Sequence, residues 1–424
     1  MTYPQMSADE LRAEKASLEA AYRAVCKQHL SLNLARGKPS SEQLDLSEAI
    51  LSFPATSAET IAPDGMDTRN YGFLTGVPAL RSLFADLLGV GEEDILLGTN
   101  STLSMIYDAV CRAVLFGVCD GCKPWKDQGT IRFLCPTPGY DRHFAICEKF
   151  GIEMIPVAMT GHGPDMDAVE ALVADPQVKG MLCVPKYANP TGETYDAETV
   201  RRIAALKPAA RDFRVFWDMA YLLHDLDETP DTLGNIFTLV KGTPNEDLVL
   251  GFFSTSKITY PGAGVAMMIS GKANVERAVR DISIRMIGPD KINQLRHLRY
   301  LQNAAHMKEL MREHAAILGP KMDAAARILD EELTPCGVAH FVKPHGGYFI
   351  SLNVYPGTAK RTEALAKAAG VTLTPAGAAF PYHRDPNDEN LRIAPSYPPL
   401  AEVEAAMRVV ALCAKLAAAE VLLR

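Results

Sequence analysis

Lys257 lies in a loop whose composition suits a lysine that reacts as an amine. The apolar run 247–253 precedes the loop, and Ser254, Thr255 and Ser256 lead directly to the lysine. Because such a run is typical of a buried strand, the loop after it could carry the lysine into a cleft. There a lysine can form a Schiff base with a carbonyl compound, while hydroxyl groups can bind a phosphate. Most lysines are solvated, so the loop by itself favours an ordinary surface residue.

Asp218 closes a second, mostly apolar run, Phe213–Trp217, where another buried strand is expected to end. A carboxylate in such a place is costly unless a cation pairs with it. The protonated ring nitrogen of pyridoxal 5'-phosphate (PLP) is a suitable cation, and the pair would keep the ring able to accept electrons. A helix N-cap or a structural salt bridge would explain Asp218 equally well.

Three further residues could contact the ring of this cofactor. Tyr221, three positions after Asp218, could donate to the ring oxygen, and so could the amide of Asn189 in its Asn-Pro turn. Tyr140, in the stiff turn Pro136–His143, could stack on the ring. Each also has an ordinary explanation, because buried tyrosines pack, Asn-Pro pairs form turns, and turns carry surface aromatics.

Phosphate and carboxylate groups would need donors as well. Ser101 and Thr102 stand where a helix is expected to begin, and the N–H groups and dipole of a helix start favour an anion. Ser254 adds a hydroxyl from the lysine loop. Arg392 lies in an apolar, strand-like run, where a guanidinium needs an anionic partner such as a substrate carboxylate. N-capping and a structural ion pair are the alternatives for these residues.

Short apolar runs alternate with helical segments from about residue 78 to 300. Strands separated by helices predict βαβ units, and therefore an α/β fold with a mostly parallel, covered sheet. The expected strands are Ile131–Cys135, Glu153–Val157, Gly180–Val184, Phe213–Trp217, Leu248–Phe253 and Val265–Ile269.

The two ends of the chain predict a smaller α+β domain. A capped helix is expected over Ser7–Tyr22, and a long amphipathic helix over Gln302–Glu332. Later come the short expected strands Gly346–Asn353, Val371–Thr374 and Asn390–Ala394 and a closing helix, Glu402–Leu423. We therefore divide the chain into residues 1–67 (N-terminal part of the small domain and arm), 68–301 (large PLP-binding domain) and 302–424 (linking helix and C-terminal small domain).

The composition excludes several classes of partner. A net charge of −8 and a pI near 5.7 argue against a nucleic-acid surface, and no apolar run is long enough to span a membrane. The first residues lack the pattern of a signal peptide, so the cytoplasm is the expected compartment. The nine cysteines show no framework spacing and are expected to be reduced. Cys119 and Cys122 are expected to be free thiols rather than a zinc or redox site, and no metal site is expected.

The candidate residues occur in a characteristic order: phosphate turn, aromatic turn, Asn-Pro turn, acidic strand end, lysine loop and late arginine. In this order the chain resembles the class I aminotransferases of the aspartate aminotransferase superfamily over nearly its whole length. The stretches Asn33–Pro39 and Arg69–Gly76 support the resemblance, and Ile287–Lys291 makes the chain most similar to a divergent bacterial subgroup. The resemblance implies the PLP-dependent transferase fold and a homodimer whose active sites lie at the subunit interface.

The resemblance also assigns roles around the cofactor ring. Lys257 would form the Schiff base with PLP and later move the substrate's Cα proton. Asp218 would hold the pyridine nitrogen, and Asn189 and Tyr221 would hold the ring oxygen. Tyr140 would stack on the ring, at a position where the family often has tryptophan.

The same comparison implies how phosphate and substrate are held. Ser101, Thr102 and Ser254 would bind the phosphate, and Tyr71 would reach it from the neighbouring subunit. Arg392 would bind the substrate's α-carboxylate, helped by the backbone at Gly37.

Two positions depart from the family pattern. The family usually has a phosphate-binding arginine eight residues after the lysine, and this chain has Val265 there. The arginine that reads a second substrate carboxylate has no clean match, and Lys291 and Arg285 lie near its spacing. We name Lys291 as the candidate for that role.

The implied activity is transamination in two halves, with aspartate and 2-oxoglutarate as the expected substrates. Another amino donor (aromatic, alanine or aminoadipate type) and a PLP-dependent lyase or decarboxylase stay open, although Arg392 favours a reaction that retains the carboxylate. A transcriptional regulator would need a DNA-binding segment, for which the short acidic N-terminal stretch leaves no room. A nucleotide-dependent oxidoreductase is disfavoured because no GxGxxG follows the first expected strand.

Overall fold

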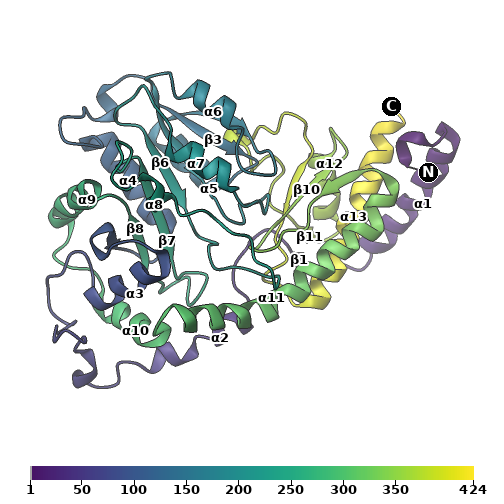
Figure 1. Ribbon diagram of the computed structural model, residues 1–424. Coiled ribbons are helices and arrows are strands. Elements are labelled where there is room, and N and C mark those ends of the chain that lie inside the picture. The colour runs from purple at the N-terminus through teal and green to yellow at the C-terminus, as the bar shows by residue number, and fades with distance from the viewer. Residues whose placement is uncertain (1) are drawn as a thin grey trace.

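A seven-stranded sheet forms the centre of the computed structural model, which describes residues 2–424 (Figure 1). Its strands lie in the order β2-β8-β7-β6-β5-β3-β4. Their bounds are β2 (Ile95–Leu97), β3 (Arg132–Thr137), β4 (Glu153–Ala158), β5 (Val178–Cys183), β6 (Arg214–Asp218), β7 (Val249–Ser254) and β8 (Ala266–Ile269). Only β8 runs against its neighbours, since it pairs antiparallel with both β2 and β7.

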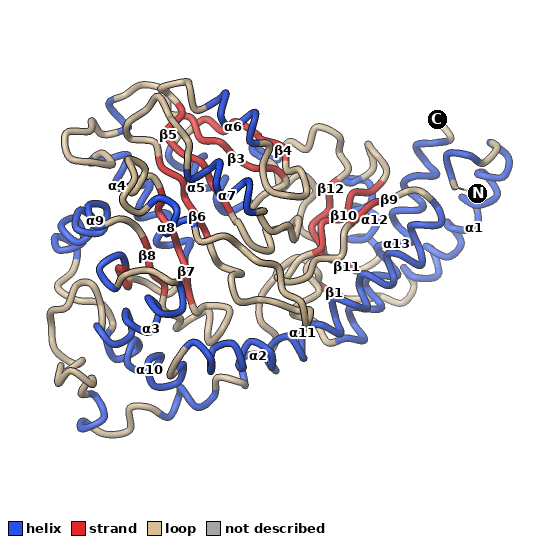
Figure 2. The backbone as a smooth tube through the Cα atoms, viewed as in Figure 1, coloured by secondary structure: helices blue, strands red, loops and turns tan. Residues whose placement is uncertain are grey.

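Helices cover both faces of this sheet (Figure 2). They are α3 (Pro78–Leu88), α4 (Thr102–Phe116), α5 (Asp141–Phe150), α6 (Met166–Leu172), α7 (Ala197–Ala204), α8 (Ile236–Val240), α9 (Lys272–Arg285) and α10 (Lys291–Leu301). Successive side chains of a strand point to opposite faces. Thus Phe216 packs in the cluster with α4, α5 and α9, while its neighbour Trp217 packs in the cluster with α3, α6 and α7. A sheet buried on both faces explains why its strands are continuous apolar runs.

The parallel strands place their carboxyl ends along one edge of the sheet. β3, β5, β6 and β7 are parallel to one another, and they end at Thr137, Cys183, Asp218 and Ser254. The turns that follow these residues therefore lie side by side, although they are far apart in the sequence. Ligands of open α/β sheets bind at such an edge.

A smaller unit combines both ends of the chain. It contains the pair β1 (Leu32–Asn33) and β11 (Val371–Thr372) and a three-stranded antiparallel sheet in the order β12-β10-β9. The remaining elements are α1 (Ala8–Cys26), α2 (Ser41–Asp45), α11 (Ala304–Leu333), β9 (Ala339–Phe341), β10 (Ile350–Val354), α12 (Ala359–Ala368), β12 (Asn390–Ile393) and α13 (Leu400–Leu422). The helix α13 packs against α1 and α11, and α11 extends from this unit along the large sheet (Figure 1).

The expected α/β fold with a mostly parallel sheet is confirmed. All six expected strands of the large sheet are present, with ends that differ from the expected ones by at most two residues. The short strands β2 and β9 and the separate helix α10 were not expected; Gln302, at a φ of 56°, ends α10, and Asn303 caps α11. The division at residues 67/68 and 301/302 stays a prediction.

The cysteines depart from expectation at one point. Cys119 and Cys122 are joined as a disulfide with their Cα atoms 5.2 Å apart, so the expectation of two free thiols is wrong for this pair. A CxxC turn brings the two Cα atoms within the range that a disulfide spans. The other seven cysteines are free. Within residues 2–424 no helix is long and apolar enough to cross a membrane.

Gly180 of β5 offers a test of how tightly the sheet is packed. A Cβ atom at this position would lie 2.5 Å from Cζ of the buried Phe133 on the adjacent strand β3. We expect Gly180→Ala to destabilise the protein by about 1–3 kcal/mol, since a filled core must shift to accept a methyl group. Thermal unfolding checks this, with Gly262→Ala as the control because a Cβ there meets nothing within 4 Å. Equal thermal midpoints for the two variants would contradict the packing argument.

Candidate functional site

The turns at the carboxyl edge of the sheet surround a pocket of about 540 Å³, counted with its open mouth. The pocket is lined by Ser101, Thr102, Leu103, Tyr140, Val184, Asn189, Asp218, Ala220, Tyr221, Ser256 and Lys257. Most of the residues singled out in the sequence therefore meet in one place, brought there by α4, α5, β5, β6 and β7.

Asp218 is the buried acid of the pocket, with 1% of its surface exposed. Its Oδ2 lies 3.1 Å from Nε2 of His143 and 3.4 Å from the Thr102 hydroxyl, and its Oδ1 accepts a 3.1 Å hydrogen bond from the Ala220 N–H. Within residues 2–424 no lysine or arginine forms an ion pair with it. The carboxylate is thus held by donors in a dry place and can accept a further cationic N–H group.

Lys257 follows β7 and lines the same pocket. Burial lowers the pKa of its ammonium group, an effect that the negative charge of Asp218 opposes. Its Nζ lies 4.8 Å from the centre of the Tyr221 ring. A lowered pKa increases the fraction of free amine, which is the nucleophilic form of lysine.

Buried side chains fix the backbone of the lysine turn. Nε2 of His224 lies 3.3 Å and the Tyr348 hydroxyl 3.5 Å from the carbonyl oxygen of Lys257. On the next residue, Ile258, the carbonyl oxygen lies 3.0 Å from Nε2 of His314. Burial lowers the pKa of His224 to about 3 and also lowers that of His314. Both rings are therefore neutral at physiological pH and can hold the turn without adding charge near the lysine.

The expected phosphate donors lie at the start of α4 and in the lysine loop. Ser101 is the N-cap of α4, and its Oγ accepts a 3.3 Å hydrogen bond from the Ser104 N–H. Ser254 is buried with its Oγ 2.8 Å from Oγ of Ser256, and it is Ser256 that lines the pocket. Val265, at the place of the family's usual arginine, is buried in the core. The expected phosphate site is thus built from hydroxyl groups and from the backbone N–H groups at the start of α4.

Two tyrosines and an asparagine form the walls of the pocket. Burial raises the pKa of Tyr221 well above its ordinary value and that of Tyr140 to about 12, so both phenols keep their protons. A protonated phenol is a hydrogen-bond donor. Asn189 is buried, and its Oδ1 accepts a 3.3 Å hydrogen bond from Nη1 of Arg392. The three side chains can therefore hold a flat, oxygen-bearing ring.

Arg392 reaches the large unit from β12 of the small one. Its Nη1 lies 2.7 Å from Oδ1 of Asp141, and its Nε and Nη2 each lie 3.4 Å from the Thr374 hydroxyl. The guanidinium also lies over the Phe349 ring, 5.2 Å from its centre. Gly37 touches the same ring, because a Cβ there would lie 2.3 Å from Cζ of Phe349. The carboxylate-binding candidates Arg392 and Gly37 are therefore neighbours through Phe349.

Like Ser254, Gly37 and Arg392, the predicted residues Tyr71 and Lys291 do not line the pocket in the single chain. Tyr71 is 77% exposed. Lys291 is buried, and its Nζ donates a 3.1 Å hydrogen bond to the Gly72 carbonyl. Lys291 thus contacts the Tyr71 loop rather than the pocket of its own chain, and its role as a reader of a substrate carboxylate stays a prediction. The contact follows from its place at the start of α10, beside Gly288, which itself packs on Gly72.

Several site residues were missed in the sequence. His143 and Asp141 stand in the quoted turn Pro136–His143, and a histidine one helical turn after Tyr140 was the available signal for His143. His224 and Tyr348 gave no signal, because they reach the lysine turn only through the tertiary fold.

The residues present fit PLP. Among the described residues 2–424, Asp218 has no lysine or arginine partner, and such a buried carboxylate suits a pyridinium N–H. The start of α4 offers hydroxyls and free N–H groups, which suit a phosphate. Lys257 is a desolvated amine in the same pocket, which suits an aldehyde.

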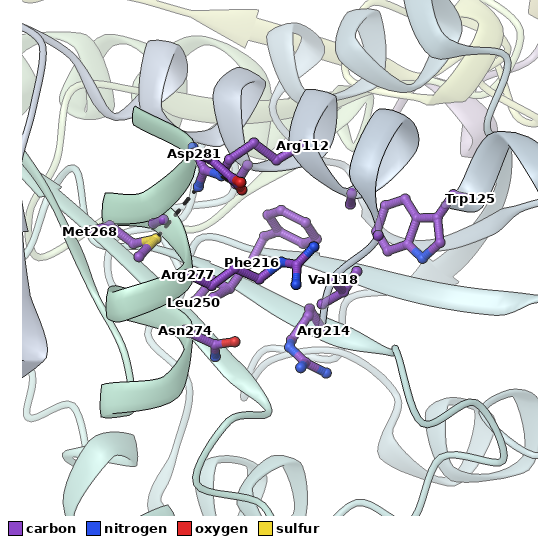
Figure 3. Close-up of a pocket in the computed structure, with 14 residues that line it drawn as sticks. Arg112, Val118, Trp125, Arg214, Phe216, Leu250, Met268, Asn274, Arg277 and Asp281 are labelled. Carbon is purple, nitrogen blue, oxygen red and sulfur yellow. Dashed lines mark hydrogen bonds and ion pairs between the residues drawn. The ribbon is translucent and has the colours of Figure 1, made fainter. Parts of the chain in front are cut away.

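A second cavity lies away from this edge, between α4, α9 and the sheet (Figure 3). Arg112, Arg214, Arg277 and Asp281 line it, and burial lowers the pKa of Arg214 to about 10. This cavity contains neither a lysine nor a hydroxyl group. We therefore place the candidate active site at Lys257.

The lowered pKa of Lys257 has a consequence for stability. The unfolded chain binds more protons at this residue than the folded one between the lowered pKa and the ordinary value of 10.5, so its contribution to stability rises with pH there. We expect Lys257→Met, in protein freed of cofactor, to raise the thermal midpoint at neutral pH and to lose part of this advantage as the pH rises. Lys272→Met is the control, since Lys272 is exposed. A pH-independent difference from wild type would contradict the lowered pKa.

Comparisons with known proteins agree with this geometry. The profile of the aspartate amino-transferase family matches residues 6–424. An aspartate aminotransferase of Corynebacterium glutamicum is 49% identical over 393 residues, which are 92% of this chain and 90% of that protein. The crystal structure of an aspartate transaminase from C. glutamicum superposes with a TM-score of 0.97 at 45% identity, covering 100% of this chain and 99% of that one. The α-aminoadipate aminotransferase of Thermus thermophilus, solved with N-(5'-phosphopyridoxyl)-L-leucine, shares the fold with a TM-score of 0.73 at 21% identity, over 98% of this chain and 100% of that one. This chain belongs to the aspartate aminotransferase family of PLP-dependent enzymes.

Proposed function

We propose that this enzyme transfers the amino group of aspartate to 2-oxoglutarate, with PLP held by the pocket around Lys257. The observation that carries the proposal is the meeting of a desolvated lysine, a buried acid and a phenol donor in one pocket, with Arg392 hydrogen-bonded to the pocket residue Asn189. The similarity to an aspartate aminotransferase of C. glutamicum supports aspartate as the donor.

PLP, when bound, supplies an aldehyde that condenses with amines and a ring that takes up the electron pair left at the substrate's Cα. Asp218 would pair with the ring nitrogen, and His143 and Thr102 would hold the acid in place. Tyr221 and Asn189 would donate to the ring oxygen. Ser101 and Thr102 would bind the phosphate together with Ser254 and Ser256.

Lys257 has two tasks in this proposal. Its free amine would attach the cofactor. Once displaced by the substrate amine, it would take the proton from the substrate's Cα and deliver it to the cofactor's C4′ carbon. Arg392 would bind the α-carboxylate and so fix which bond of Cα faces the lysine. Retaining that carboxylate favours transamination over decarboxylation.

Lys257→Ala tests the assignment of the catalytic amine. We expect the rate of aspartate-dependent oxaloacetate formation to fall by at least about 10³-fold, because nucleophile and proton carrier are both lost. Lys272→Ala, on an exposed side chain of α9, serves as the control and is expected to keep wild-type turnover. Turnover within tenfold of wild type in Lys257→Ala would remove the assignment.

The donor is tested separately with wild-type protein and a panel of amino acids. Single-turnover spectra should show aspartate and glutamate reacting faster than aromatic or aliphatic amino acids. A clear preference for an aromatic, alanine or aminoadipate donor would replace the proposed substrate while leaving the reaction class unchanged.

We further propose that the enzyme is a homodimer in which Tyr71 completes the partner's site. Large apolar side chains are exposed next to each other on the Tyr71 loop and at the end of α9: Tyr71 at 77%, Phe73 at 49%, Ile284 at 89% and Ile287 at 62%. Gly288 packs on the Gly72 carbonyl, so these two segments form one surface. Contiguous exposed apolar patches mark interaction surfaces. Lys291, which holds Gly72, would then position the Tyr71 loop.

Mixing two inactive variants tests this sharing. One subunit carries Lys257→Ala and the other Tyr71→Ala, so a mixed dimer contains one site with both Lys257 and the partner's Tyr71. After co-expression at equal levels, we expect activity to recover to about one quarter of wild type, because half of the dimers are mixed and each has one intact site. No recovery above the separate variants would show that Tyr71 serves its own subunit or neither.

We also propose that the enzyme is cytoplasmic, that its domains divide at residues 67/68 and 301/302, and that its substrates are small amino and 2-oxo acids. The net charge of −8 supports the absence of nucleic-acid partners.

A further inference from the structure

Asp141 forms an ion pair with the guanidinium of Arg392, on which the proposed carboxylate subsite depends. It is the first residue of α5, on the large unit, and its Oδ1 lies 2.7 Å from Nη1 of Arg392 on β12 of the small unit. The side chain of Arg392 is 9% exposed and that of Asp141 is 25% exposed. The pair is therefore partly desolvated, and it lies beside the pocket residue Asn189, which accepts from the same Nη1.

The hydrogen bonds of Arg392 leave no free edge for a second carboxylate. Nη1 contacts both Asp141 and Asn189, and Nε and Nη2 share the Thr374 hydroxyl. A guanidinium binds a carboxylate best through two parallel N–H groups. A substrate can reach that arrangement on the Nη1 side only if the Asp141 carboxylate moves away.

The contact with Asp141 is built so that it can be exchanged. Only one oxygen of Asp141 hydrogen-bonds to Arg392, so the pair lacks the two-point geometry of a strong Arg–carboxylate contact. A released Asp141 carboxylate is not stranded, because it remains in the first turn of α5, where the helix dipole favours negative charge. Thr374 continues to hold Arg392, and its own hydroxyl donates a 2.7 Å hydrogen bond to the Ala35 carbonyl.

We infer that Asp141 is a displaceable counter-ion of Arg392 that lowers the affinity of the subsite for carboxylates and restricts it to ligands able to pair through both oxygens. The inference rests on the proposed role of Arg392 in substrate binding. Asp141 acts on the substrate through Arg392, so it is a specificity-determining residue and takes part in no bond-making step. The ligand class concerned is carboxylate anions, amino and 2-oxo acids included.

Asp141→Asn tests the inference with succinate, a dicarboxylate that has no amino group and cannot react. Isothermal titration of the holoenzyme should give a Kd about five- to tenfold lower for the variant, since the amide leaves the geometry in place but removes the competing charge. The KM for aspartate should fall with it, while kcat changes by less than about twofold. Glu148→Gln removes the same charge from an exposed position on α5 and is expected to leave the Kd unchanged.

A double variant separates the competing explanation that the charge of Asp141 repels carboxylates directly, without acting through Arg392. In the Arg392→Leu background, Asp141→Asn should no longer tighten succinate binding, because the competition needs both partners. Weaker binding in Asp141→Asn, or a Kd equal to that of Glu148→Gln, would overturn the inference. Asp141→Ala repeats the measurement if the Asn variant unfolds at lower temperature than wild type.

These outcomes are independent of the reaction. If the holoenzyme proves inactive with every amino acid of the donor panel, the proposed function fails while the succinate Kd still reports on Asp141. If turnover is as proposed but the Kd does not fall, only the counter-ion role is lost.

Discussion

A parallel sheet that is buried on both faces has only its edges and strand ends available for polar chemistry, and the site of this protein follows from that constraint. The strands β3, β5, β6 and β7 end together, so the turns after them contribute side chains from residues 140, 189, 218 and 257 to a single pocket. The helices that cover the faces supply the rest. α4 and α5 both begin at this edge and direct their N–H groups and positive dipole ends toward it.

Burial away from water determines the reactivity of the charged groups in the pocket. Asp218 is held by His143, Thr102 and a backbone N–H, and Lys257 has a lowered pKa because it is withdrawn from water. The neutral rings of His224 and His314 fix the lysine turn without adding positive charge, which would lower the pKa of the lysine further. A reactive amine and a fixed acid are thus obtained from the same burial that stabilises the sheet.

The smaller unit contributes Arg392 beside this pocket. β12 carries Arg392 to the large unit, where its guanidinium packs on the ring of Phe349. Gly37, which has no Cβ, leaves room for the Phe349 ring. The pair with Asp141 joins the two units directly. A carboxylate that displaced Asp141 as proposed would therefore change a contact between the units as well as the charge beside Arg392. In the proposed homodimer, the exposed Tyr71 loop would provide a second such link, toward the partner subunit.

The sequence by itself determined the alternation of strands and helices, because continuous apolar runs and helical periodicity are local properties. The boundaries of β3 to β8 fall within two residues of the expected ones, and the order of the motifs along the chain was sufficient to recognise the family. The roles proposed for Lys257, Asp218 and Arg392 likewise came from motifs that each lie within a few residues.

Only the tertiary structure decided which side chains meet across the fold. The sequence did not identify Asp141, because its partner Arg392 is 251 residues away. His224 and Tyr348 likewise contact the Lys257 carbonyl from remote positions in the chain. The backbone positions also decided that Lys291 points toward Gly72 rather than the pocket. They likewise placed the Cβ atoms of Cys119 and Cys122 within reach of a disulfide. Local patterns fix the elements, whereas ion pairs and hydrogen bonds between elements depend on distances of a few ångströms that no local pattern encodes.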